Sequence, residues 1–132
     1  MQKNWFVIMP LLIGIAVAPI LSAQQMSSQL SEDQAVGLMR TINTAQMGWF
    51  SRHQTFANLS DLEQDKLLSE CEEILNSTGI DSASVGGYEL KVLVPFDGRH
   101  YSTSLTPAQG CGVAMFSTDQ GVIFRATALG CQ

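Results

Sequence analysis

The chain has 132 residues, three cysteines and a formal net charge of −5 at pH 7. This length predicts one domain with a core of its own. The seven Lys and Arg residues form no cluster, which argues against a nucleic-acid partner because such a partner requires a basic surface. The cysteines and histidines also lack the close pairs of a zinc site, so we expect no metal and no cofactor.

Residues 1–23 have the order of regions that is typical of an export signal. A short start with one Lys precedes an uncharged apolar stretch, and small residues end at Ala23 before the polar Gln24. We predict cleavage between Ala23 and Gln24. A polar leader over 24–30 and a single domain over 31–132 would remain. A retained membrane anchor is the alternative, because the apolar span approaches the length that crosses a bilayer.

Export predicts a periplasmic or extracellular protein in an oxidising compartment. Removal of the signal takes one Lys away, so the mature chain would keep 12 acidic and 6 basic residues, a formal charge of −6. We expect contact with a membrane only if the apolar span is retained.

The domain is predicted to begin with a helix. Ser31 and Gln34 have the spacing of a capping box, and apolar residues then recur every three or four positions, as on one face of a helix. The opposite face would carry Arg40, Asn43 and Gln46. The apolar positions are Ala35, Leu38, Ile42, Ala45 and Trp49.

A second helix is predicted from Leu59 to about Leu75, where Gly79 would allow the chain to leave it. Acidic residues are frequent between Asp61 and Glu73. They lack the alternating ligands of a calcium loop, so we interpret them as a solvated helix face. The expected buried side consists of Leu62, Leu67, Leu68, Cys71, Ile74 and Leu75.

Alternation of apolar and polar residues predicts four strands in the second half of the domain. Gly121 would supply the positive φ of the turn in the last hairpin. In this register Phe116 faces Phe124 on a compact inner face. Ala114 faces Ala126 on the same side. The predicted strands are 88–92, 101–106, 113–117 and 122–127.

These elements predict an α+β fold: an N-terminal helix plus a second helix packed on a four-stranded antiparallel sheet. Three runs resemble bacterial type IV pilin-like and pseudopilin-like proteins, namely 35–46, 87–90 and 116–123. In that family the first run belongs to the long N-terminal helix and the last to the final hairpin. The resemblance implies a helix packed on an antiparallel sheet.

The start of the chain differs from that family. Pilins carry a Gly-Phe processing site and a Glu at the fifth mature position. No Gly-Phe pair precedes Gln24, and the first acidic residue is Glu32. Pro19 and the polar leader also interrupt any continuous helix. The resemblance therefore implies a pilin-like globular domain that is exported alone, with other envelope or secretion-system proteins as partners.

Few residues are candidates for catalysis. His53 and His100 are the only histidines and lie in predicted loops without a nucleophile motif. Cys71 has three acidic neighbours, which raise the pKa of a thiol and oppose a reactive thiolate. We therefore predict a non-enzymatic structural or interaction protein. The alternatives are a small secreted enzyme or ligand-binding domain that uses a histidine or the acidic helix, and a membrane-anchored, atypical minor pilin.

The remaining predictions concern a disulfide and an aromatic cluster. The last hairpin brings Cys111 within two residues of Cys131, so we predict that these two form a disulfide and that Cys71 is a buried thiol. A bridge from Cys71 to either of the others is the alternative. A separate aromatic group would close one end of the core, with an exposed partner site as the alternative. Its members are Trp49, Phe50 and Phe56.

Overall fold

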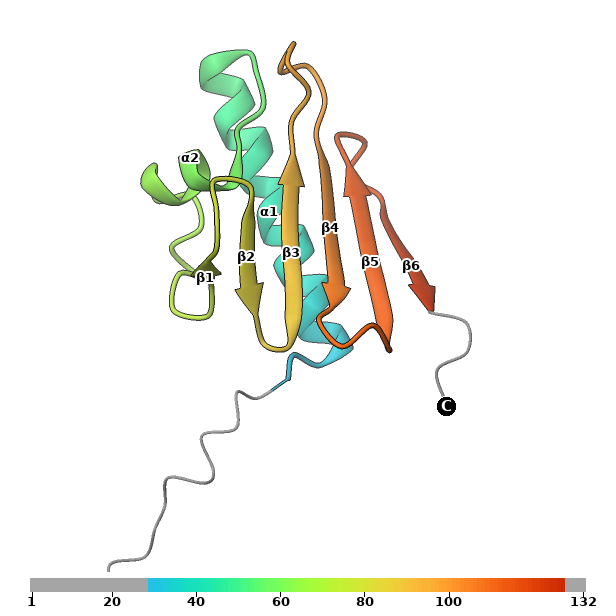
Figure 1. The fold of residues 1–132 in the computed structure, drawn as a ribbon. Coiled ribbons are helices and arrows are strands. Elements are labelled where there is room, and N and C mark those ends of the chain that lie inside the picture. Colours follow the sequence, from blue (N-terminus) through green and yellow to red (C-terminus); the bar gives the residue numbers. More distant parts are fainter. Residues whose placement is uncertain (1–28, 128–132) are drawn as a thin grey trace, which may run out of the picture.

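A computed structural model describes residues 29–127 as one antiparallel sheet with two helices (Figure 1). Neighbouring strands follow the chain order from β1 to β6. Within the described range, no helix is both long and apolar enough to cross a membrane. The elements are α1 (Glu32–His53), α2 (Leu59–Gln64), β1 (Asn76–Ser77), β2 (Ser82–Val85), β3 (Tyr88–Leu93), β4 (Ser102–Pro107), β5 (Val113–Thr118) and β6 (Ile123–Thr127).

The predicted four-stranded sheet with two substantial helices is therefore wrong. The sheet has six strands, and only α1 is a long helix. The two unpredicted strands, β1 and β2, are short and rich in serine. In β2 only Ala83 and Val85 are buried, and this weak alternation between small residues gives little sequence signal.

The prediction for α1 is confirmed at both its start and its buried face. Ser31 Oγ accepts from the Gln34 N–H at 3.2 Å, and the Ser31 N–H donates to Gln34 Oε1 at 2.9 Å, which is the predicted capping box. Beyond the last turn, Gln54 adopts a left-handed conformation, and its N–H donates to the Phe50 carbonyl. Four predicted stripe residues are buried, namely Ala35, Leu38, Ile42 and Ala45.

The second helix is much shorter than predicted because it is capped without a glycine. Lys66 has a φ of 60°, and its N–H donates to the Glu63 carbonyl at 3.1 Å. The N–H of Leu67 donates to the Leu62 carbonyl, also at 3.1 Å. These two bonds are those of a Schellman motif, which ends a helix. The chain continues in turns, and its buried residues in this stretch include Leu68.

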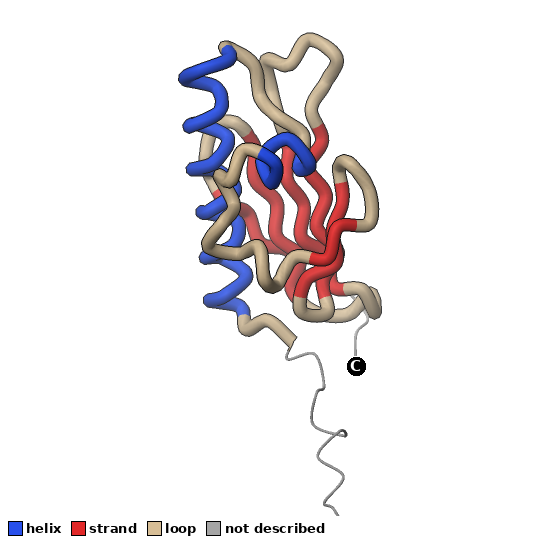
Figure 2. The backbone as a smooth tube through the Cα atoms, turned by 90° about the vertical axis from the view of Figure 1, so that its left-hand side faces the viewer, coloured by secondary structure: helices blue, strands red, loops and turns tan. Residues whose placement is uncertain are grey.

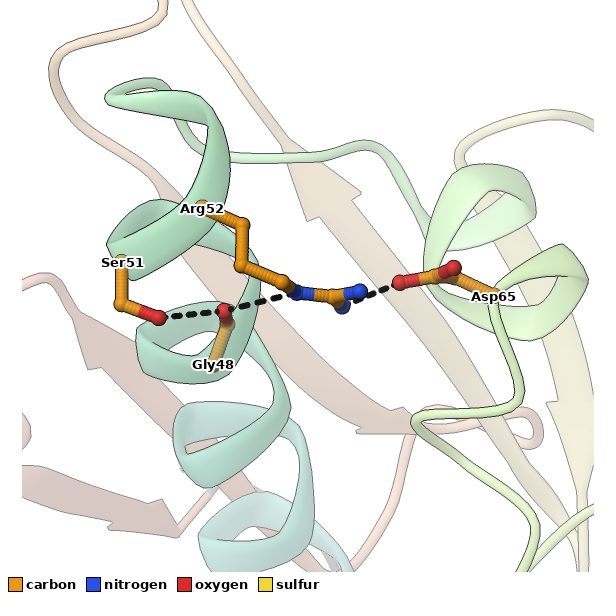
Figure 3. A network of polar contacts seen from close by, with 4 residues as sticks. All are labelled: Gly48, Ser51, Arg52 and Asp65. Atoms are coloured by element: carbon orange, nitrogen blue, oxygen red, sulfur yellow. Dashed lines mark hydrogen bonds and ion pairs between the residues drawn. The ribbon is translucent and has the colours of Figure 1, made fainter.

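The C-terminal turn of α1 is tied to the segment after α2 (Figure 3). Arg52 forms an ion pair with Asp65, and its Nε–H donates to the Gly48 carbonyl at 3.4 Å. Ser51 Oγ donates to the same carbonyl at 2.8 Å. Because both ion-pair partners are solvated, we expect this pair to contribute at most about 1 kcal/mol.

The helix α1 lies along one face of the sheet, and the other face carries no helix among residues 29–127 (Figure 2). Figure 1 looks onto this uncovered face, with α1 behind the strands. The strands contribute inward-facing residues to a single core with α1 and the α2 region. The largest of these strand residues are Val85, Tyr88, Leu90, Val92, Leu105 and Met115.

The final hairpin has the predicted register but the opposite facing. Phe116 pairs with Phe124, as predicted, and Gly121 has the expected positive φ of 75°. However, Met115 lies opposite Leu105 of β4, and both are buried. Because successive side chains of a strand alternate between faces, Phe116 points away from the core. The predicted compact inner face is therefore wrong.

Candidate functional site

The aromatic residues near the end of α1 are half-buried and stack in pairs. Phe50 stacks on Phe56 with ring centroids 4.7 Å apart, and Phe56 meets the edge of Tyr101 at 4.8 Å. His53 stacks on Trp49 at 3.9 Å. Trp49 packs against the core, and Phe50 and Phe56 are half-buried, so the closing of the core by all three stays a prediction. His53 is thus part of an aromatic pair on the last turns of α1.

The second histidine lies in a different setting, at the end of the sheet where β4 begins and β5 ends. His100 Nδ1 and Asp119 Oδ2 are 3.0 Å apart. They border a hollow of about 520 Å³, which Ser102 and Thr118 also line. A carboxylate on one ring nitrogen leaves the other available for a ligand. Within residues 29–127, no three side chains are grouped as ligands for a metal ion.

Tyr101 also lines this hollow, and its hydroxyl connects the hollow to α1. Burial, and then the nearby Asp119, raise the pKa of Tyr101 to about 12. Its hydroxyl donates to Asn43 Oδ1 at 2.8 Å, and Ser117 Oγ donates to the same oxygen at 2.8 Å. Asn43 was predicted for the polar outer face of α1. The structure corrects this, because Asn43 bridges the helix to β5 and to the residue that precedes β4.

Gln46 is a second correction on the same helix. It was also predicted to face outward, but its side chain is fully buried. Its Nε2–H donates to the Ala57 carbonyl at 2.7 Å, and its Oε1 accepts from the Ala57 N–H at 2.9 Å. The amide thereby satisfies both main-chain groups of Ala57, which would otherwise be unpaired inside the core. Gln46 lies four residues after the buried Ile42, and this spacing was the sequence signal that could have placed it on the buried face of α1.

Cys71 is a free, buried thiol, as predicted. Burial is the main cause that raises its pKa, followed by the charges of Glu70 and Glu63. Such a thiol is a poor nucleophile. Because Cys71 is free, the alternative bridges from it are contradicted. The predicted Cys111–Cys131 bridge stays a prediction, because Cys131 lies outside the described residues.

The export-signal cleavage between Ala23 and Gln24 also falls outside the described residues and stays a prediction. The acidic run between Asp61 and Glu73 is mostly solvent-exposed, as expected, but most of it lies in turns after α2 and not on the predicted helix face. It makes local contacts: Glu63 accepts from Ser77 Oγ at 2.8 Å, and Glu72 lies 3.5 Å from the Lys66 ammonium.

The uncovered face of the sheet is the largest feature that sequence reasoning misplaced. It includes the four β5 and β6 residues that were predicted to point inward. Phe116 is 41% exposed and Phe124 is 55% exposed, although they form a cross-strand pair. Ala114 and Ala126 form the next pair on the same face. We call these four residues the apolar stripe.

The apolar stripe borders a polar region without net charge. Ser104 of β4 lies opposite Phe116, and Lys91 of β3 lies opposite Ser104. The charge of Lys91 is offset by Glu89 at 3.4 Å. This face can therefore offer aromatic surface together with hydroxyl groups, a combination that suits contact with another protein.

Comparisons with known proteins yield no relative for this chain: no family model, no curated protein and no solved structure matches it. The function must be argued from the residues and the geometry above.

Proposed function

We propose that this chain is an exported, pilin-like structural or interaction protein without enzymatic activity. It binds another envelope or secretion-system protein through the apolar stripe on the uncovered face of its sheet. The observation that supports this proposal most directly is the exposed pair of Phe116 and Phe124 on that face. Exposed apolar patches with polar rims are typical of protein interaction sites.

The surroundings of the stripe suit a partner that is itself neutral and partly apolar. The mature chain would carry an acidic excess, but the strands beside the stripe contribute mainly hydroxyl groups and the paired charges of Glu89 and Lys91. A partner would therefore bury aromatic rings without the cost of burying unpaired charge. Aromatic residues at the centre of such surfaces commonly carry most of the binding energy.

Site-specific photo-crosslinking in cells that export the protein tests this proposal. A photoreactive residue at position 116 or 124 should give an adduct with an envelope or secretion-system protein that mass spectrometry identifies. The same residue at Thr44, an exposed position on α1, is the matched control and should not give that adduct. Equal adducts from all three positions, or none from the sheet positions, would contradict the proposal.

The export part of the proposal has a separate test. The intact mass of protein recovered from the periplasm or the medium should correspond to a chain that begins at Gln24. A recovered chain that still begins at Met1 would contradict cleavage and favour the membrane-anchored alternative.

A second candidate function is the binding of a small polar ligand. The observation that favours it is the hollow beside the His100 and Asp119 pair. A fragment screen by NMR tests it: fragments should shift signals of residues 93–95 and 100–102, and His100→Ala should abolish those shifts. If no fragment acts there, or if the shifts persist in the variant, this candidate is wrong.

A further inference from the structure

The two edges of the sheet differ in length and in chemistry. At one edge, β1 has only two residues, Asn76–Ser77, and Ser77 donates to the Glu63 carboxylate. At the other edge, β6 has five residues with the sequence IFRAT. Short strands, lysines, prolines and bulges are the usual means that prevent an edge from pairing with another chain. The edge at β6 is longer, and its residues include neither lysine nor proline.

Within residues 29–127, β6 pairs only with β5. Its far side therefore presents main-chain donors and acceptors that no described strand satisfies. β-Branched and aromatic residues, which favour strands, make up three of its five positions: Ile123, Phe124 and Thr127. In Figure 1, β6 is the outermost strand, on the opposite edge from α2. This edge has the features of a strand that accepts another strand.

Charge does not oppose the approach of a second chain at this edge. Arg125 is the only charged residue of β6, and it forms an ion pair with Glu32 of α1. The rest of the mature chain would carry an acidic excess. The net like charge of two copies opposes their association in general, but β6 itself adds no unpaired charge to this repulsion.

We propose that β6 pairs in antiparallel fashion with β6 of a second copy, which joins two sheets into one across a two-fold axis. An antiparallel edge is self-complementary under such an axis. If Phe124 lies opposite Phe124 of the second copy, Arg125 lies opposite Ile123 of that copy. The two Arg125 side chains therefore do not face each other. The aromatic pair across the junction is a favourable cross-strand contact. The two apolar stripes then lie on the same side of the joined sheet.

This inference goes beyond the proposed function, because it uses the edge of the sheet and a second copy instead of the face and a different protein. Either can fail without the other. An edge of five residues buries less surface than a stable interface requires, so the dimer should be weak and depend on concentration.

Sedimentation of the exported protein over a range of concentrations tests the proposal. We expect a monomer in dilute samples and a growing dimer fraction in concentrated ones. Phe124→Lys places two like charges opposite each other at the junction and should weaken the dimer by at least about tenfold. Phe116→Lys introduces the same charge on the same face, but one strand further from the junction, and should leave most of the dimer. Circular dichroism checks that both variants are folded.

Hydrogen exchange locates the contact independently of the variants. Main-chain amides of 123–127 should exchange more slowly in concentrated samples, whereas those of β1 should not change. A protein that remains monomeric up to about 1 mM would overturn the proposal. So would a dimer that Phe116→Lys and Phe124→Lys weaken equally, because that result indicates contact between faces. The proposal would also be overturned if amide protection in concentrated samples rose only in segments other than β6.

Discussion

The two faces of the sheet are built from the same strands, but only one of them is covered by α1. On β3 the inward residues Tyr88, Leu90 and Val92 are buried, whereas Glu89 and Lys91 between them are exposed. On β5 the pattern is less expected. There the inward positions are Met115 and Ser117, and the larger Phe116 points outward.

This difference separates what holds the fold together from what remains available for binding. The covered face consists of residues that pack on α1. Substitutions there should therefore lower the stability of the whole domain. The uncovered face contributes little to that core. The pair of phenylalanines on this face is the observation from which the proposed binding surface is argued.

The largest expected effect comes from matched truncations on the two faces of β3. Leu90→Ala removes a fully buried side chain, and we expect it to lower the free energy of unfolding by about 2–5 kcal/mol. Leu93→Ala removes the same atoms from a side chain that is 53% exposed, and we expect a loss below about 1 kcal/mol. Urea unfolding measures both. Similar losses would show that the two faces do not differ in this way.

A smaller loss of stability should follow from removal of the buried side-chain amide of Gln46. Gln46→Leu leaves both main-chain groups of Ala57 without their partners, and we expect a loss of about 1–3 kcal/mol. Gln64→Leu is the matched control, because Gln64 is exposed and its only described bond is to Ser60 Oγ on the surface. Equal unfolding free energies for the two variants would argue against a structural role for Gln46.

Tyr101 should make the stability of the domain depend on pH. In the folded protein its pKa is raised from 10.0 to about 12, so the phenol ionises first in the unfolded chain. The stabilisation is fully present below pH 10 and is lost as pH rises to about 12. Urea midpoints between pH 8 and 12 should therefore fall more steeply in the wild type than in Tyr101→Phe. Parallel profiles would contradict this assignment.

Much of the fold could be predicted from local patterns, and the failures have identifiable causes. Regular alternation predicted β3, and the capping box predicted the start of α1. The end of α2 was missed because Lys66 adopts the left-handed conformation usually supplied by glycine. The hairpin pairs were predictable from the turn at Gly121. Their facing was not, because it depends on the pairing of Met115 with Leu105 in another strand.

The candidate sites depend on even more distant contacts. His100 and Asp119 are 19 positions apart, and no local motif indicates that they meet. Asn43 reaches Ser117 across 74 positions. Polar residues on a helix are usually solvated, so the pattern alone assigns both Asn43 and Gln46 to the wrong side. The apolar stripe was recognisable as apolar, but its exposure became clear only with the whole sheet.

The smallest expected effect on stability is also the most informative about function. Phe116→Ser and Phe124→Ser remove exposed rings, and we expect each to change the free energy of unfolding by less than about 1 kcal/mol, which is the span of strand propensities. Met115→Ser, at the neighbouring inward-facing position of β5, is the control and should cost several times more. If the stripe binds a partner, both phenylalanine variants should lose the crosslinked adduct while remaining folded. A large loss of stability from either would instead assign the rings to the fold, and the proposed binding surface would lose its support.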